Sequence, residues 1–322
     1  MYEESDTESG AVLIEKLHIQ GFRALRNVVL SFEPLTALVG PNSSGKSTVL
    51  QLLSPGLSVG PQQRWRKEPG DVSLEGVSNG QTLHLKMSVG SGRPTLRIDP
   101  SVYGLRVIQP LRLDLDALRR PNKLVKADFL SVTGDNLANV IGSLPRGQQA
   151  LLAEQLCDLV PTFKDVDLVP TSEVGTHTLR FHDRWMPEVT YVPDEVSDGT
   201  ILLLAFLVLQ FQSRPPDLIT IDEAERGFHP YLLGQYVDFL RKLSRGELGQ
   251  KPIQVVLATH SAELLDHLEP EEVRFLSRSD DDGSIRVSEA PTASKDWEAV
   301  RAEYENSLGG IWLSGGLGGV PG

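Results

Sequence analysis

A glycine-rich loop between an apolar run and a helix constrains the fold of this chain more than any other feature. Residues Gly40 to Ser47 read GPNSSGKS and satisfy the pattern G-x-x-x-x-G-K-[ST] in full. The run Leu35–Val39 before the loop has the continuous apolar character of a strand buried on both faces, and Lys46–Leu53 after it reads as a helix. Such a loop points its backbone N–H groups at a phosphate, and the positive end of the helix adds to the attraction. A nucleotide site within an α/β core is therefore the first prediction.

The spacing of this motif assigns roles to two of its side chains. Lys46 is placed to contact the β- and γ-phosphate oxygens, and the Ser47 hydroxyl is placed to bind Mg²⁺. ATP and Mg²⁺ are the expected ligands. The nucleotide-binding residues expected from the loop are Gly40, Pro41, Asn42, Ser43, Ser44, Gly45, Lys46, Ser47 and Thr48.

A second apolar run, Leu218–Ile221, ends in the acids Asp222 and Glu223. Side chains at the C-terminal end of a parallel strand emerge where α/β folds bind ligands. We expect Asp222 to join the Mg²⁺ shell, directly or through water, and Glu223 to orient or deprotonate the water that attacks the γ-phosphate. Acids at strand ends are often only solvated loop residues, but the complete phosphate loop gives this pair more weight.

Two shorter elements are ambiguous on local grounds. Ser197 is a natural N-cap for the apolar helix expected over 200–212, and Gly199 could let a ligand approach the backbone. A plain helix start explains the same residues, and local chemistry favours that interpretation. His260 ends the apolar run that follows the acid pair, and a lone histidine there is usually structural or at the surface.

Taken in order, these elements resemble the ABC ATPase superfamily, and most closely its soluble branch: RecF, SMC-like proteins and the ATPase half of the overcoming-lysogenization-defect (OLD) nucleases. The chain departs from the family pattern at Ala224, where proline is usual, and at Phe228, where leucine is commoner. Four segments carry the resemblance. Leu17–Leu25 resembles the family's first strand, and Ser197–Thr200 resembles its signature. Ile221–Pro230 resembles its acidic strand with the D-loop, and Thr259–Ser261 resembles its switch histidine.

The resemblance implies a mechanism built from two copies of the chain. Two ATP molecules would be held between head-to-tail subunits of an ATP-dependent homodimer, and His260 would sense the γ-phosphate. It also implies a nucleotide contact for Arg23, which could equally be a surface residue, and a metal-binding Q-loop glutamine, for which Gln109 is the candidate by position. The residues expected to face the partner's ATP are Ser197, Asp198, Gly199 and Thr200.

The alternation of strands and helices, together with the resemblance, predicts an α/β fold. We expect an ABC-type P-loop ATPase core with a mixed β-sheet, an antiparallel β subdomain and a helical insertion. The tail after Ser307 is rich in glycine, which favours disorder, with a docking strip that orders on a partner as the alternative. The expected segments are a flexible N-terminus (1–10), the first part of the core (11–56), the insertion (57–189), the second part of the core (190–290) and a C-terminal segment (291–322).

Charge and composition exclude several classes of protein. Acidic residues outnumber basic ones by 43 to 31, which disfavours coating nucleic acid by bulk charge but leaves a local basic groove possible. Cys157 is the only cysteine, so an internal disulfide framework and a cysteine-rich zinc site are excluded. The N-terminus lacks a secretory pattern, and the longest apolar run, Ile201–Phe211, is too short to span a bilayer. A soluble cytoplasmic protein without membrane contact is expected.

The biological role has two hypotheses. The chain ends about 60 residues after His260, which is too short for the Toprim nuclease domain of OLD proteins, and it has no long coiled coil. The first hypothesis is therefore an ATPase that controls a separate effector, such as a nuclease, in bacterial anti-phage defence. The second is a RecF-like DNA clamp in repair or recombination. Two basic clusters favour the clamp, although a solvated face explains them as well: Arg64/Arg66/Lys67 and Arg112/Arg119/Arg120/Lys123/Lys126.

Overall fold

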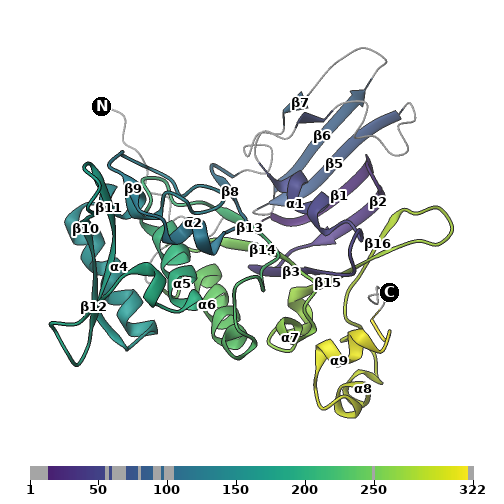
Figure 1. Ribbon diagram of the computed structural model, residues 1–322. Coiled ribbons are helices and arrows are strands. Elements are labelled where there is room, and N and C mark those ends of the chain that lie inside the picture. Colours follow the sequence, from purple (N-terminus) through teal and green to yellow (C-terminus); the bar gives the residue numbers. More distant parts are fainter. Residues whose placement is uncertain are drawn as a thin grey trace, which may run out of the picture. The chain divides into compact units, whose positions relative to one another are not determined.

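The computed structural model describes residues 14–54, 58–59, 70–78, 81–89, 96–97, 105–248 and 251–317, which form two compact units (Figure 1). Unit 1 contains Met1–Gln109, Asp217–Glu225 and Leu233–Gly322, and unit 2 contains Pro110–Pro216 and Arg226–Leu232. These limits differ from the segments expected from the sequence. Residues 190–216 group with unit 2, because the helix within them packs against three other helices of that unit.

A mixed sheet of six strands, in the order β16-β15-β3-β14-β13-β8, forms the core of unit 1. The strand before the phosphate loop and its neighbour β14 are buried along their whole length, as continuous apolar runs predict. Strands β13, β14, β3 and β15 are parallel, so their C-terminal ends meet at one edge of the sheet. The strands in spatial order are β16 (Ile285–Ser288), β15 (Val273–Arg278), β3 (Leu35–Val39), β14 (Gln254–Thr259), β13 (Leu218–Asp222) and β8 (Ile108–Leu111).

An antiparallel sheet in the order β2-β1-β5-β6 completes the strand framework of unit 1, beside a two-stranded pair of β4 and β7. Leu17, Ile19 and Leu30 from this sheet lie in the same apolar cluster as Leu38 of the mixed sheet and Leu53 of the first helix. The strands are β1 (Ile14–Phe22), β2 (Leu25–Ser31), β4 (Ser58–Val59), β5 (Gly70–Ser78), β6 (Gln81–Val89) and β7 (Leu96–Arg97).

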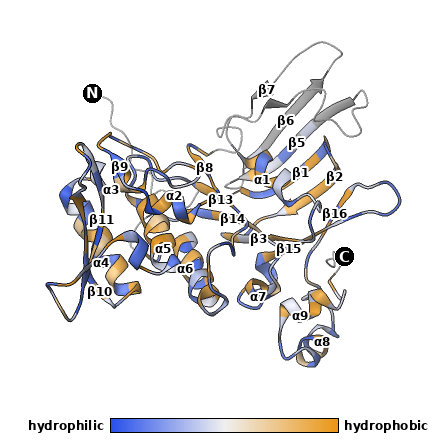
Figure 2. Ribbon diagram, in the orientation of Figure 1, coloured by the Kyte–Doolittle hydropathy of each residue, from blue (hydrophilic) through white to orange (hydrophobic). Residues whose placement is uncertain are grey.

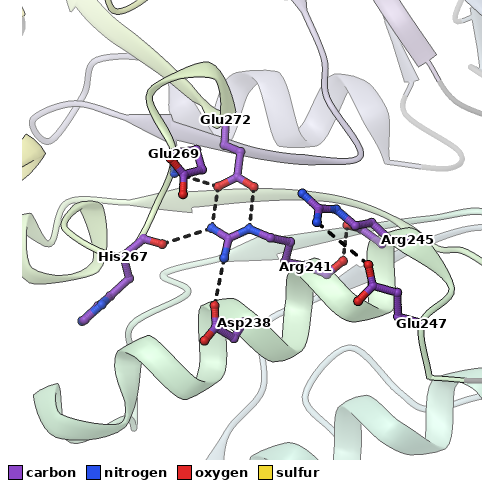
Figure 3. A network of polar contacts seen from close by, with 8 residues as sticks. Asp238, Arg241, Arg245, Glu247, His267, Glu269 and Glu272 are labelled. Carbon is purple, nitrogen blue, oxygen red and sulfur yellow. Dashed lines mark hydrogen bonds and ion pairs between the residues drawn. The ribbon is translucent and has the colours of Figure 1, made fainter. Parts of the chain in front are cut away.

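Helices α1 (Lys46–Leu53) and α6 (Leu233–Arg245) pack on the mixed sheet. Arg241 joins α6 to the short helix η7 (Pro270–Glu272), which precedes β15, through a bidentate hydrogen bond to Glu272 (Figure 3). Its Nε and Nη2 atoms each lie 2.9 Å from a carboxylate oxygen of Glu272. The hydrogen bond from Arg241 to Glu272 is the largest influence on the guanidinium and raises its pKa. Such planar, charged pairs fix orientation as well as distance.

Unit 2 combines a small sheet with a buried helix. Helix α5 (Asp198–Val208) continues into η5 (Leu209–Phe211) and is apolar almost all round, as its orange colour shows (Figure 2). It packs against α2, α3 and α4, which explains why such an apolar helix is stable in this unit. Strand β11 pairs with β10, β12 and β9. The remaining elements are α2 (Leu115–Arg119), β9 (Asn122–Lys123), α3 (Leu137–Ser143), α4 (Arg146–Leu159), β10 (Phe163–Pro170), β11 (Thr176–Asp183), β12 (Thr190–Tyr191), η4 (Pro193–Glu195) and η6 (Pro230–Leu232).

Residues 307–317 of the C-terminal segment are ordered and include a helix, so the expectation of disorder is wrong for them. Helices α8 (Trp297–Glu303) and α9 (Leu308–Leu313) follow β16, and α9 packs on α7 (Ala262–Leu265). Trp312 is fully buried, and Ser307 Oγ and Gly309 N both donate to Asp266 Oδ1. Glycine content favoured disorder, but the apolar residues between the glycines supply a buried face.

Within the described ranges, no helix combines the length and the apolar character that crossing a bilayer requires.

Candidate nucleotide-binding site

The loop between β3 and α1 is shaped by two glycines that no other residue could replace without movement. Gly45 has a φ of 104°, and a Cβ built there would overlap the side chain of Ile285. A Cβ at Gly40 would overlap the carbonyl oxygen of Leu276 and lie 2.7 Å from Ser44 Oγ. The loop therefore packs directly on β15 and β16, and its backbone carries no side chain at the two glycines.

Lys46 is the first residue of α1, and its side chain folds back over the loop. Nζ donates to the carbonyl oxygens of Gly40 at 2.6 Å and Pro41 at 2.9 Å. Burial is the main influence on this ammonium and lowers its pKa, while the negative charges of Glu225 and Asp222 act in the opposite direction. A half-buried ammonium above a bare loop is suited to bind a phosphate oxygen.

Ser44 provides a direct test of whether the loop fits a phosphate. Its Oγ is buried and has no hydrogen-bond partner, and the residue as a whole is 1% exposed. A buried hydroxyl without a partner is costly unless a ligand supplies one. A phosphate oxygen would supply it, so the residues present fit a nucleotide.

Ser47 and Asp222 come together from α1 and the end of β13. Ser47 Oγ lies 3.4 Å from each carboxylate oxygen of Asp222. Two neighbouring ligands of an octahedral Mg²⁺ lie about 3 Å apart, so this pair fits the ion. No cluster of three or more His, Cys, Asp or Glu side chains suited to a metal occurs in the described part of the chain. A phosphate-bound Mg²⁺ needs only one or two carboxylates, so this finding agrees with the pair.

Glu223, immediately after β13, has a left-handed backbone with a φ of 56°. This conformation is uncommon for residues with a side chain, and such positions concentrate at functional sites. The next residue explains one departure from the family pattern. Ala224 N donates to Ala258 O at 3.1 Å, a bond that proline could not make because it has no N–H.

The structure adds Glu225, which the sequence analysis did not single out. Its carboxylate accepts hydrogen bonds from Thr259 Oγ1 at 2.7 Å and from His260 N at 3.2 Å, and it lies 2.9 Å from His260 Nδ1. His260 is thus tied to the segment after the acid pair rather than being isolated at the surface. The third acid in the run DEAE was the available signal, but nothing in the sequence showed that it would face Thr259 and His260.

Two arginines lie close to the loop. Arg278, at the end of β15, donates from Nε to Ser43 O at 2.7 Å and from Nη1 to Gly283 O at 2.9 Å, and the sequence analysis missed it. Arg23 donates to Gln51 Oε1 of α1 at 2.6 Å and stacks over the Phe22 ring. Arg23 is therefore held beside the helix that the phosphate loop begins, and its contact with nucleotide stays a prediction.

The residues expected to form the signature lie in unit 2, at the start of α5. Ser197 is the N-cap, and its Oγ accepts from Thr200 N at 3.3 Å and lies 2.8 Å from Thr200 Oγ1. Asp198 in the first turn is exposed, whereas Gly199 and Thr200 are buried. A Cβ at Gly199 would lie 2.9 Å from Leu232 Cδ1, so packing also favours glycine here.

Gln109 is buried, at 7% exposure, within β8 at the edge of the mixed sheet and beside β13. A role on the metal stays a prediction for this residue. Of the basic clusters, Arg64, Arg66 and Lys67 lie outside the described residues. In the second cluster, Arg119 is bonded to Asp198 and Lys126 is paired with Asp128, so these charges are already engaged within the chain.

Comparisons with known proteins support this assignment. Residues 13–55 match the family described as AAA ATPase domain. Residues 164–266 match the family described as AAA domain, putative AbiEii toxin, Type IV TA system. The first match contains the phosphate loop and the second contains the acid pair and His260.

Solved structures of SMC heads are similar to this chain in fold. The SMC head bound to the C-winged helix domain of ScpA aligns with 15% identity and a TM-score of 0.52, over 87% of this chain and 98% of that one. The fold is that of an ABC-type ATPase head. The SMC head domain from Thermotoga maritima aligns with this head fold at 13% identity and a TM-score of 0.50, over 86% and 98% of the two chains. A Pyrococcus furiosus SMC head with an extended coiled coil, bound to the C-terminal domain of ScpA, aligns with 13% identity and a TM-score of 0.54. The alignment covers 90% of this chain and 100% of that one.

Proposed function

We propose that this protein is an ATP-hydrolysing molecular switch that works as a homodimer. The observation that carries the proposal is the meeting of Ser47 and Asp222 beside a loop whose buried Ser44 hydroxyl lacks a partner. Lys46 and the bare backbone of the loop would hold the β- and γ-phosphates. A bound Mg²⁺, held by Ser47 and Asp222, would neutralise charge on the phosphates.

Glu223 and His260 have the reacting roles in this proposal. Glu223 would orient the attacking water and accept its proton, for which a carboxylate at the end of β13 is suited. His260 would contact the γ-phosphate and register its loss. Ser197 to Thr200 would face ATP bound by the other copy in a head-to-tail dimer, where the start of α5 supplies backbone N–H groups. Hydrolysis would then loosen the dimer, which couples nucleotide state to shape.

A separate effector polypeptide, such as a nuclease, is the proposed target of the switch. Two of the similar SMC heads are described as bound to parts of ScpA, which supports a protein partner for a head of this fold. The matched family description names a putative toxin and a Type IV TA system, which supports a role in bacterial defence. We expect the protein to act in the cytoplasm.

The decisive variant is Glu223→Gln, which keeps the shape of the side chain but cannot accept a proton. We expect it to form a stable dimer with ATP and Mg²⁺ and to lose at least about 100-fold in turnover. Size-exclusion chromatography with light scattering and a phosphate-release assay measure both quantities. Lys46→Ala should abolish the dimer, and Glu188→Gln, at an exposed position, should behave as the parent. Turnover near the parent's rate in Glu223→Gln would remove Glu223 from its role.

The effector and the clamp hypotheses are separated by two further experiments. Co-purification of tagged protein with the product of an adjacent gene supports the effector hypothesis. A gel-shift series with ATP at increasing salt tests the clamp, because phosphate contacts give a steep loss of DNA affinity with salt. Tight, salt-sensitive DNA binding by the chain alone would favour the clamp.

A further inference from the structure

We infer that Glu225 is a positioning residue that fixes the orientation and the tautomer of His260. The inference rests on the proposed function in one respect, namely that His260 contacts the γ-phosphate. The contact between the two side chains belongs to the protein without nucleotide, so it can be tested separately.

The Glu225 carboxylate is held at both oxygens. Oε2 accepts from Thr259 Oγ1 at 2.7 Å, and Oε1 lies 2.9 Å from His260 Nδ1 and 3.2 Å from His260 N. Thr259 is buried and ends β14, a central strand of the sheet. The carboxylate therefore cannot rotate without breaking a bond to a rigid element.

Glu225 is much less exposed to solvent than His260. The Glu225 side chain is 16% exposed and the His260 side chain is 56% exposed. The carboxylate contacts Nδ1, while much of the imidazole remains accessible. This arrangement suits a ring that meets a ligand from solvent and is oriented from within the protein.

The chemistry of the two groups selects one tautomer. An ionised carboxylate can only accept hydrogen bonds, so the nitrogen that faces it must carry the hydrogen. Nδ1 therefore carries the hydrogen in the neutral ring, and Nε2 is left to interact with a ligand. A carboxylate behind a functional histidine commonly acts in this way, by holding both the tautomer and the ring plane.

The same carboxylate also acts on the phosphate loop. Among the charges that oppose the effect of burial on the pKa of Lys46, Glu225 is the largest. Glu225 thus interacts electrostatically with the ammonium that would bind phosphate, and it directly contacts the histidine that would sense it. A substitution at this position is expected to affect both groups.

The test is ¹⁵N NMR of histidine-labelled, nucleotide-free protein at pH 8, where ordinary imidazoles are neutral. The parent should show the Nδ1–H form at His260, identified by the signal that disappears in His260→Ala. In Glu225→Ala no acceptor holds the hydrogen on Nδ1, so the signal should move toward the Nε2–H form. Glu263→Ala is the matched control: it removes a nearby carboxylate that accepts from Ser261 Oγ instead of from the ring, and it should leave the signal unchanged. An unchanged His260 tautomer in Glu225→Ala would overturn the inference.

Turnover separates this inference from the proposed function. We expect Glu225→Ala to lower kcat by roughly 10- to 100-fold, as for other carboxylates that orient a functional histidine, and Glu225→Asp to recover part of the loss. If His260→Ala retains the parent's kcat, the proposed role of His260 fails, although the tautomer result stands. If His260→Ala loses activity while Glu225→Ala keeps both the tautomer and kcat, only the role of Glu225 fails.

Discussion

The guanidinium of Arg119 lies 2.6 Å from Asp198 Oδ1 and so joins α2 to the first turn of α5. The same side chain donates to Pro193 O at 3.0 Å and to Val196 O at 3.1 Å, so it spans the turn that leads into the helix. An arginine that the sequence places in a basic cluster is therefore an internal support for the segment proposed to face a second ATP.

We predict that Arg119→Met destabilises the protein by about 1–3 kcal/mol, because two carbonyl groups and a carboxylate lose a charged partner. The substitution should also weaken ATP-dependent dimerisation, since the start of α5 loses its support. Urea unfolding and light scattering with ATP measure the two effects. Arg120→Met, at the exposed neighbouring position, is the control. Equal stability of the two variants would contradict the prediction.

Ala224→Pro should cost about 1–3 kcal/mol of stability, although proline is usual at this position in the family it resembles. The change removes the hydrogen bond to Ala258 O and places proline after Glu223, whose φ of 56° suits neither extended nor polyproline backbone. Ala224→Ser retains the N–H and should remain close to the parent. Chemical unfolding measures the difference, and a proline variant as stable as the serine variant would refute the expectation.

Gly309→Ala should release α9 from α7. A methyl group at this position would overlap the backbone of Ala262, which is not a flexible side chain and cannot move aside. Hydrogen exchange over residues 297–317 should increase by at least about tenfold, which corresponds to roughly 1.4 kcal/mol. Gly147→Ala, where a Cβ meets nothing within 4 Å, serves as the control. Unchanged protection of Trp312 would show that the close approach is dispensable.

Asp217 makes stability depend on pH in the acid range. Burial acts to raise the pKa of this carboxyl, but hydrogen bonds from Lys251 and from the N–H groups of Val107 and Arg106 outweigh it, and the net pKa is lowered. The stabilisation is thus complete above the ordinary pKa of about 3.9 and is lost as the pH falls through the lower folded value. Asp217→Asn should cost about 3 kcal/mol at pH 7, and the difference should shrink below about pH 4. Urea midpoints between pH 7 and pH 3 test this; a constant difference would contradict it.

Local patterns predicted much of the fold. Continuous apolar runs marked β3, β13 and β14, and the phosphate-loop motif placed Ser47 and Asp222 at one site although they are far apart in sequence. The contact of Glu225 with His260 was not predictable, because it depends on the parallel register that sets Asp222 beside Ala258. Arg278 was missed for a similar reason, since only the pairing of β15 with β3 brings it to Ser43.

The tail shows the limit of composition as a guide. Glycine content is a property of a segment alone, whereas the order of α9 depends on what Ile311 and Trp312 meet in the rest of unit 1. Gly309 is part of the packed surface itself, since only a residue without a side chain allows the backbone of Ala262 to approach so closely.

The chain leaves unit 1 directly after Glu225, contributes the short stretch Arg226–Leu232 to unit 2, and returns to unit 1 at Leu233. Neither unit is consequently a continuous piece of polypeptide, and no single cut of the gene would yield one of them whole. The next peptide bond after Glu225 already belongs to the stretch that groups with unit 2, so the acidic residues and this stretch share one continuous segment of backbone.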